Sequence, residues 1–348
     1  MNNSDTKIAI LKTLWGRVED GRWGIRSAKS LALKPQNGFD SDFFKFESGM
    51  ELFNSGARNI HEIFASFGPT DFLLKQSILP VVAWVENEDV LRCIGTAFVI
   101  SWTGYVITAC HVLLDPTERN YGKVVREGNI LKFMGNLHMG VLIPISPAYG
   151  VRGYRFFSFE QSWYWGEWKS SPLLHEAEKF SYLTDIAVCK IAEMPNGVSH
   201  QPLSVSLNSF QIGEKAYVFG YAEMDDLPVE GIENGMPLIK YFKHDLYVSI
   251  GEVAAVFPEN HLKKDVPTPG PCFDFRAKIP GKMSGGPILG ADGAVTRGVV
   301  SRSFSGERHA YGAMLGPVVR LSLIENKSLG SMMESGNEGI AQVRGEGL

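Results

Sequence analysis

The sequence has no long hydrophobic run. No stretch of about 18 apolar residues occurs, so no membrane-spanning helix is expected. Near the start only Ile8 to Leu11 form a short apolar patch, and no signal peptide is expected. Neither sign of charge is in large excess, because the formal net charge is -4. The composition therefore gives no reason to expect a nucleic acid or a membrane as partner.

Cysteine is also scarce. The four cysteines are far apart in the chain and include no C-x-x-C pair of the kind that binds zinc or carries redox chemistry. We expect them to be free, buried thiols in a reducing cytoplasm, and we expect no metal and no organic cofactor. They are Cys93, Cys110, Cys189 and Cys272.

Hydrophobic residues make up 44% and charged residues 21% of the 348-residue chain, which is typical of a globular protein with a sizeable core. In "ESGMELFNSGARNIHEIFASFG" the apolar residues fall largely at spacings of three, four and seven, which predicts helix. We therefore expect residues 1–77 to form a helical N-terminal extension. The end of the chain, 326–348, is rich in Gly, Ser and Glu and is predicted to be a flexible tail.

From Ile78 onward the pattern changes to short β-rich runs such as "ILPVVAWV", "GTAFVI", "YVITAC" and "KAYVFGYA". Many short strands without helices between them predict an antiparallel sandwich or barrel. The stretch 116–183 fits neither period and contains Trp163, Trp165 and Trp168. We interpret these aromatic residues as packed core rather than as a platform for bases.

Three residues at strand ends have side chains suited to nucleophilic catalysis. His111 follows the strands of "GTAFVISWTGYVITACHV", Asp185 begins "DIAVCKI", and Ser284 lies between glycines in "PGKMSGGPIL". Each one alone also fits a structural role, as a strand-end histidine, a strand-initiating aspartate or a turn serine. Together they could supply a nucleophile, a base and an orienting carboxylate.

The motifs "TACHV", "TDIAV" and "MSGGPIL" resemble the His, Asp and Ser motifs of the chymotrypsin-fold serine proteases, in the same chain order. The bacterial trypsin-like branch, which includes the HtrA-type proteases, is the most similar. The resemblance implies a mainly β fold with two six-stranded antiparallel barrels. It places a trypsin-like protease domain over 78–325, with the catalytic cleft between the barrels and an insertion at about 116–183.

The resemblance also assigns catalytic roles. Ser284 Oγ would attack a peptide carbonyl, His111 would take and return the proton, and Asp185 would orient His111. The backbone N–H groups of Lys282 and Ser284 would bind the oxyanion.

Further positions match support and substrate sites. Ser301 matches a serine that supports the aspartate, and the strand from Ser301 through Arg302 to Ser303 would pair with the substrate. Ala277 or Lys278 would lie at the base of the specificity pocket, where a lysine would favour acidic side chains.

One position departs from the family pattern. The family has glycine two residues before the nucleophile, whereas this chain has Lys282 there and Gly281 one residue earlier. A positive φ would strain a lysine. Either the loop carries an extra residue, or it rests in an inactive conformation until a substrate or partner reshapes it.

The sequence therefore predicts a cytoplasmic serine endopeptidase that acts on polypeptides. Two alternatives stay open: a catalytically inactive binding protein with the protease fold, and an effector protease activated by a regulatory protein partner.

Overall fold

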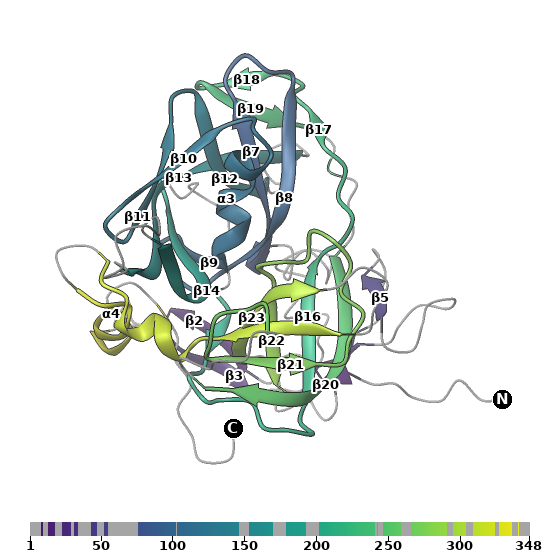
Figure 1. Ribbon diagram of the computed structural model, residues 1–348. Coiled ribbons are helices and arrows are strands. Elements are labelled where there is room, and N and C mark those ends of the chain that lie inside the picture. The colour runs from purple at the N-terminus through teal and green to yellow at the C-terminus, as the bar shows by residue number, and fades with distance from the viewer. Residues whose placement is uncertain are drawn as a thin grey trace.

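The structure is a computed structural model in which two β-barrels form most of the described chain (Figure 1). Besides six short N-terminal strands, it describes residues 76–101, 103–145, 153–169, 179–192, 202–240, 242, 246–258, 266–290, 295–303, 309–323, 327–335 and 340.

The first barrel has six strands, because β13 pairs with both β12 and β14 and so closes the sheet. All pairs around this barrel are antiparallel. Its strands are mostly buried, and every residue of β7 lies in the interior. In order around the barrel they are β13 (Gly153–Lys169), β12 (Leu137–Ile145), β7 (Ile78–Val85), β8 (Val90–Val99), β9 (Tyr105–Ala109) and β14 (Lys179–Ile191).

The second barrel closes in the same way, through the pairing of β23 with β24. Figure 1 shows it in green and yellow below the blue and teal first barrel. In order around the barrel its strands are β23 (Val295–Ser303), β22 (Pro287–Gly290), β16 (Lys215–Tyr221), β20 (Leu246–Phe257), β21 (Cys272–Phe275) and β24 (Ala310–Met314). The predicted mainly β fold with two six-stranded antiparallel barrels is confirmed.

The stretch 116–183 supplies strands to the first barrel. Two of them, β12 and β13, are barrel strands, and the pair β10 and β11 forms a hairpin outside the six. Trp163 on β13 is 1% exposed and stacks on Tyr105 with ring centroids 6.2 Å apart, so it belongs to the core. The remaining strands are β10 (Lys123–Glu127), β11 (Ile130–Met134), β15 (Ser204–Val205), β17 (Leu227–Pro228), β18 (Ile232–Glu233) and β19 (Met236–Ile239).

Apart from residues 76 and 77, which are helical, the described part of the N-terminal extension consists of strands. The predicted helical extension is not confirmed: Leu52–Asn54, inside the segment with helical spacing, is a strand, and most of that segment lies outside the described residues. One strand, Phe43–Phe46, pairs with β20 of the second barrel. The N-terminal strands are β1 (Ile8–Ala9), β2 (Thr13–Arg17), β3 (Trp23–Ala28), β4 (Leu31–Leu33), β5 (Phe43–Phe46) and β6 (Leu52–Asn54).

Helices are short in this fold. They include α3 (Cys110–Glu118), the 3₁₀ helix η2 (Gly316–Arg320) and α4 (Leu329–Ser335). None of the helices in the described part of the chain has the length and apolar character needed to cross a membrane.

Candidate active site

The first barrel brings His111 and Asp185 together. His111 lies in the first turn of α3, directly after β9. In the pairing of β14 with β9, Ile186 lies opposite Ala109, so Asp185 reaches the point where α3 begins. In Figure 1, α3 lies within the outline of the first barrel, above the labels of β9 and β14.

Two hydrogen bonds hold the imidazole against the carboxylate. His111 Nδ1 lies 2.7 Å from Asp185 Oδ2, and the backbone N–H of His111 donates to Oδ1 at 3.0 Å. The second bond also satisfies one of the free N–H groups at the start of a helix, where negative charge is favourable. This two-point contact fixes the ring so that Nε2 points away from the carboxylate.

Ser301 on β23 of the second barrel completes the surroundings of the carboxylate. Its hydroxyl donates to Asp185 Oδ2. The Thr268 hydroxyl lies 3.0 Å from Ser301 Oγ and can donate to it, since the single proton of Ser301 is already used. Both hydroxyl residues are almost fully buried. The predicted support of Asp185 by Ser301 is therefore present as a contact across the two barrels.

The pKa values of the pair follow from this arrangement. Burial lowers the pKa of His111, but the charge of Asp185 and the hydrogen bond to it outweigh burial and raise the pKa above 6.5, with Arg302 opposing. Burial raises the pKa of Asp185, but the charge of His111 and hydrogen bonds from His111 and Ser301 hold it below 3.8. The carboxylate is therefore ionised at neutral pH.

Ser284 lies in a tight elbow between β21 and β22. The next residue, Gly285, has φ +87°, and a Cβ there would lie 2.0 Å from the carbonyl oxygen of Thr96 and 2.2 Å from Thr108 Oγ1. Only glycine fits such a position. The elbow is therefore pressed against β8 and β9 of the first barrel, which carries His111.

The Ser284 hydroxyl points to an unexpected partner. Its Oγ donates to the carbonyl oxygen of Ser301 at 3.2 Å, and no hydrogen bond joins it to His111 within the described residues. The Ser284 hydroxyl must therefore exchange the Ser301 carbonyl for His111 as its hydrogen-bond partner before His111 can receive the proton. Such bonds are often long or misaligned in structures without substrate.

In the loop before Ser284, Lys282 has the positive φ that the sequence analysis identified as strained for a lysine. Lys282 has φ +73°, a left-handed value that costs a non-glycine residue about 1–3 kcal/mol. The preceding Gly281 does not have a positive φ, and a side chain there would meet open space. The positive φ therefore falls on the lysine and not on the glycine.

In this loop the backbone carbonyls are hydrogen-bonded, whereas the N–H groups of Lys282 and Ser284 bond to no described residue. The backbone N–H groups of Lys282 and Ser284 donate to no acceptor among the described residues. In contrast, each carbonyl from Gly281 to Ser284 accepts a hydrogen bond. The Gly281 carbonyl accepts from the N–H of Glu223 at 2.8 Å, and the Met283 carbonyl accepts from the N–H of Gly286 at 3.0 Å. The Lys282 carbonyl accepts from the Thr96 hydroxyl at 3.0 Å, and the Ser284 carbonyl accepts from the N–H of Thr96 at 2.8 Å. This pattern turns the carbonyl of Gly281 toward Glu223 and leaves the N–H groups of Lys282 and Ser284 available to bind an anion.

The predicted specificity residues have different environments. Ala277 is 1% exposed and belongs to the core of the second barrel. Lys278 is exposed, and its carbonyl accepts a hydrogen bond from Ser249 Oγ at 2.7 Å. Arg302 is exposed and Ser303 is half-buried, so the substrate strand predicted at 301–303 presents polar side chains.

The cysteines are free and buried, as predicted. Burial raises the pKa of Cys110 and of Cys189, so these thiols, although near His111 and Asp185, are not activated nucleophiles. Across the described residues, no cluster of His, Cys, Asp or Glu side chains suits a metal ion.

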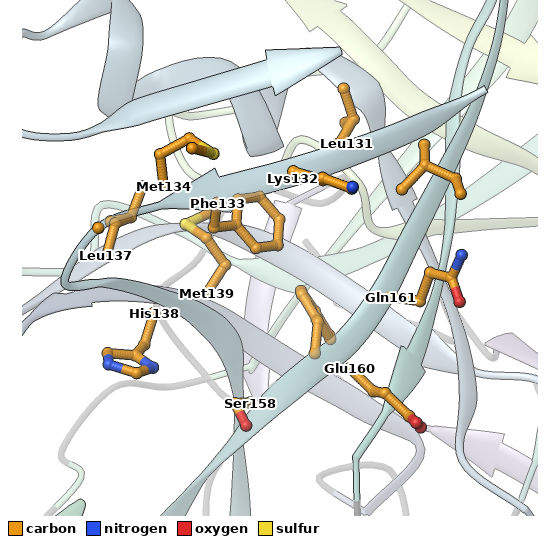
Figure 2. Close-up of a pocket in the computed structure, with 13 residues that line it drawn as sticks. Leu131, Lys132, Phe133, Met134, Leu137, His138, Met139, Ser158, Glu160 and Gln161 are labelled. Carbon is orange, nitrogen blue, oxygen red and sulfur yellow. The ribbon is translucent and has the colours of Figure 1, made fainter. Parts of the chain in front are cut away.

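A pocket of about 410 Å³ lies elsewhere, in the first barrel where β11 diverges from β12 and β13. Figure 2 shows Phe133, Met134 and Met139 gathered on one side of it, with Glu160 and Gln161 on the other. Since none of the three candidate catalytic residues lines it, this pocket is separate from the active site.

Two closed barrels, with a His–Asp pair on the first and a serine elbow on the second, define the class of chymotrypsin-fold serine proteases. Residues 95–296 match the trypsin-like peptidase domain family, and this match spans more than half of the chain. The chain belongs to that family.

Several solved structures are similar to this chain. Deg5 is 16% identical, with 75% of this chain and 93% of that chain covered and a TM-score of 0.40. The active form of the Rv3671c protease from M. tuberculosis is 16% identical, with 78% and 84% covered and a TM-score of 0.37. Neuropsin, a serine protease from mouse brain, is 11% identical, with 68% and 89% covered and a TM-score of 0.38. No curated protein matches this chain significantly.

Sequence reasoning missed two hydroxyl residues of the site. Thr96 and Thr268 lie in segments whose patterns indicate only a strand or a loop. Their partners, Lys282 and Ser301, are distant in the sequence, so no local signal identifies them.

Proposed function

We propose that this protein is a serine endopeptidase that hydrolyses peptide bonds through an acyl-enzyme. The observation that carries the proposal is the hydrogen-bonded chain from Ser301 through Asp185 to His111, placed beside a glycine-flanked serine. This combination of a buried carboxylate, an oriented imidazole and a strained serine elbow suits acyl transfer.

The chemistry follows from the positions of the groups. Ser284 Oγ attacks the carbonyl carbon of the scissile bond while His111 Nε2 takes the hydroxyl proton. The imidazolium that forms is stabilised by Asp185, and the carbonyl oxygen becomes an oxyanion bound by the N–H groups of Lys282 and Ser284. His111 then gives the proton to the leaving amine. Water repeats the sequence on the ester and releases the acid product.

Activation by substrate or by a regulatory protein partner is a second candidate feature. It is favoured by the Ser284 hydroxyl, which donates to the Ser301 carbonyl rather than to His111. A peptide that pairs with the strand at Ser301 would change the surroundings of the hydrogen bond between the Ser284 hydroxyl and the Ser301 carbonyl. An inactive binding protein stays the alternative in which the hydroxyl never reaches the imidazole.

The remaining proposals concern context. We place a polypeptide substrate along Ser301, Arg302 and Ser303, and an acidic side chain near Lys278. The protease domain is assigned to 78–325, between an extension at 1–77 and a tail at 326–348. A cytoplasmic location is proposed because the four cysteines are free thiols. A bacterial source is proposed from the resemblance to the bacterial trypsin-like branch.

Labelling with a fluorophosphonate probe tests the function directly. The wild-type protein is expected to form one adduct, located by mass spectrometry on the peptide that contains Ser284. Ser284→Ala is expected to give no adduct, whereas Ser331→Ala, a change at an exposed serine of α4, is expected to label like the wild type. Absence of labelling in the wild type, with and without added peptide substrate, would contradict the proposal.

The pH dependence has a defined sign. His111 must be neutral to accept the proton, and its pKa is raised above 6.5, so kcat/KM is expected to fall with decreasing pH through an apparent pKa above 6.5. The same shift stabilises the fold below pH 6.5, and this contribution is lost as the pH rises through the raised pKa. A pH–rate profile whose acidic limb lies at or below pH 6.5 would contradict this assignment.

A further inference from the structure

Lys282 combines a strained backbone with an anchored side chain. Its φ of +73° lies in the left-handed region that favours glycine. Its ammonium group donates to the carbonyl oxygen of Cys93 on β8 at 2.7 Å. The side chain therefore spans from the serine loop of the second barrel to a strand of the first.

The backbone of the same residue is anchored to the same strand. Thr96 Oγ1 donates to the carbonyl oxygen of Lys282 at 3.0 Å, and the N–H of Thr96 donates to the carbonyl oxygen of Ser284 at 2.8 Å. Strand β8 thus contacts Lys282 twice and Ser284 once, and these are the two residues whose N–H groups would bind the oxyanion.

Thr96 is suited to holding the loop in place because all of its polar groups are hydrogen-bonded in one arrangement. Its hydroxyl accepts a bond from the N–H of Tyr221 at 3.1 Å while donating to Lys282. Its carbonyl accepts a bond from Thr108 Oγ1 at 2.7 Å. The residue is fully buried, so its hydroxyl cannot turn to water instead. The direction of the bond to Lys282 is therefore fixed.

The anchor on Cys93 is fixed as well. The N–H of Cys93 donates to Asp226 Oδ1 at 3.2 Å, while the carbonyl of the same residue accepts from Lys282. A carboxylate on one side and an ammonium on the other hold this residue of β8 in place. The ammonium group of Lys282 therefore donates to the carbonyl of a buried residue that is itself held in place.

We propose that the Lys282 side chain and the Thr96 hydroxyl are positioning groups that hold residue 282 in its left-handed conformation, so that a lysine can serve where the family has glycine. This inference rests on the proposed function, because it concerns the N–H groups that bind the oxyanion. A glycine needs no such anchors, since a positive φ is not strained for it. A lysine lacks this conformational freedom, and two hydrogen bonds to the first barrel, one to Cys93 and one from Thr96, hold its backbone instead.

The test compares substitutions that separate the anchor from the backbone. Lys282→Met keeps the length of the side chain but removes the ammonium, and Lys282→Gly removes both the ammonium and the strain. Rates of fluorophosphonate labelling and kcat for a peptide amide are measured for each variant, with Lys215→Met, at an exposed lysine of β16, as the matched control.

Lys282→Met is expected to lower kcat about 100-fold, the usual effect of losing one oxyanion donor, with little change in KM. Lys282→Gly is expected to retain at least ten times the kcat of Lys282→Met. Thr96→Val is expected to resemble Lys282→Met, and Thr96→Ser, which keeps the hydroxyl, is expected to recover most of the rate. Lys215→Met is expected to behave like the wild type.

Two results would overturn the inference: Lys282→Met with wild-type kcat, or Lys282→Gly that falls as far as Lys282→Met. A crystal structure of each Lys282 variant supplies a readout that needs no activity. Residue 282 is expected to leave the left-handed region in Lys282→Met and to keep it in Lys282→Gly. If the wild type does not label at all, the proposed function fails, while the φ of residue 282 in these crystals still decides the inference.

Discussion

Asp185→Asn is expected to lower kcat by about 10⁴-fold while the protein stays folded. The amide can still fill the space, but it carries no charge to stabilise the imidazolium of His111. It can also donate to Nδ1, which would leave the proton of a neutral ring on Nε2, where the base is needed. Steady-state kinetics with a peptide amide, together with circular dichroism, measures both parts of the prediction.

The chain offers a matched control for this change. Asp274 is also buried and also lies beside a histidine, with Oδ1 at 3.0 Å from His309 Nδ1. Asp274→Asn is expected to leave kcat within a few-fold of the wild type. The pH profile adds a second check, since loss of the Asp185 charge lowers the pKa of His111 and moves the acidic limb down. Equal losses in the two variants would show that Asp185 has only a structural role.

Gly285→Ala is expected to destabilise the protein by about 2–5 kcal/mol, combining the cost of a left-handed alanine with that of overpacking. The new Cβ would lie 2.0 Å from the Thr96 carbonyl oxygen and 2.2 Å from Thr108 Oγ1. The carbonyl belongs to a barrel strand and cannot move far, so the serine elbow must shift. Chemical denaturation and fluorophosphonate labelling are expected to show lower stability and lost reactivity together.

Gly231→Ala is the control for this second change. A Cβ at Gly231 would meet no atom within 4 Å, and its φ is not left-handed. Its free energy of unfolding is expected to stay within about 0.5 kcal/mol of the wild type. If Gly285→Ala proves equally stable, the close packing of the elbow against β8 is incorrect.

The sequence predicted the two barrels better than it predicted which segments form their strands. The predicted β-rich run "ILPVVAWV" coincides with β7. The 17-residue β13 was not predicted, because its mixture of aromatic and polar residues does not alternate regularly. Its pairing with two different barrel strands depends on long-range contacts, which no local pattern encodes.

The helical spacing in the N-terminal segment is tested at one place only, because most of that segment lies outside the described residues. Apolar residues three and four apart predicted helix, yet Leu52–Asn54 forms the strand β6, which pairs with β4. Sheet pairing replaces the local preference there, as tertiary context often does.

The candidate site was predicted at the level of residue types and chain order. His111, Asp185 and Ser301 are in hydrogen-bond contact as the motifs implied. The conflict at Lys282 was also visible, since the sequence places a lysine where a positive φ is needed. The sequence could not show that the lysine adopts this φ with its ammonium on Cys93, because that contact joins residues 189 positions apart.

The bonds from Thr96 make the two barrels interdependent. The free N–H groups belong to the second barrel, but the strand that holds their carbonyls in place belongs to the first. A small rotation of one barrel against the other would therefore alter the anion site. We therefore expect a molecule that wedges the barrels apart to weaken the proposed activity, and one that clamps them together to strengthen it.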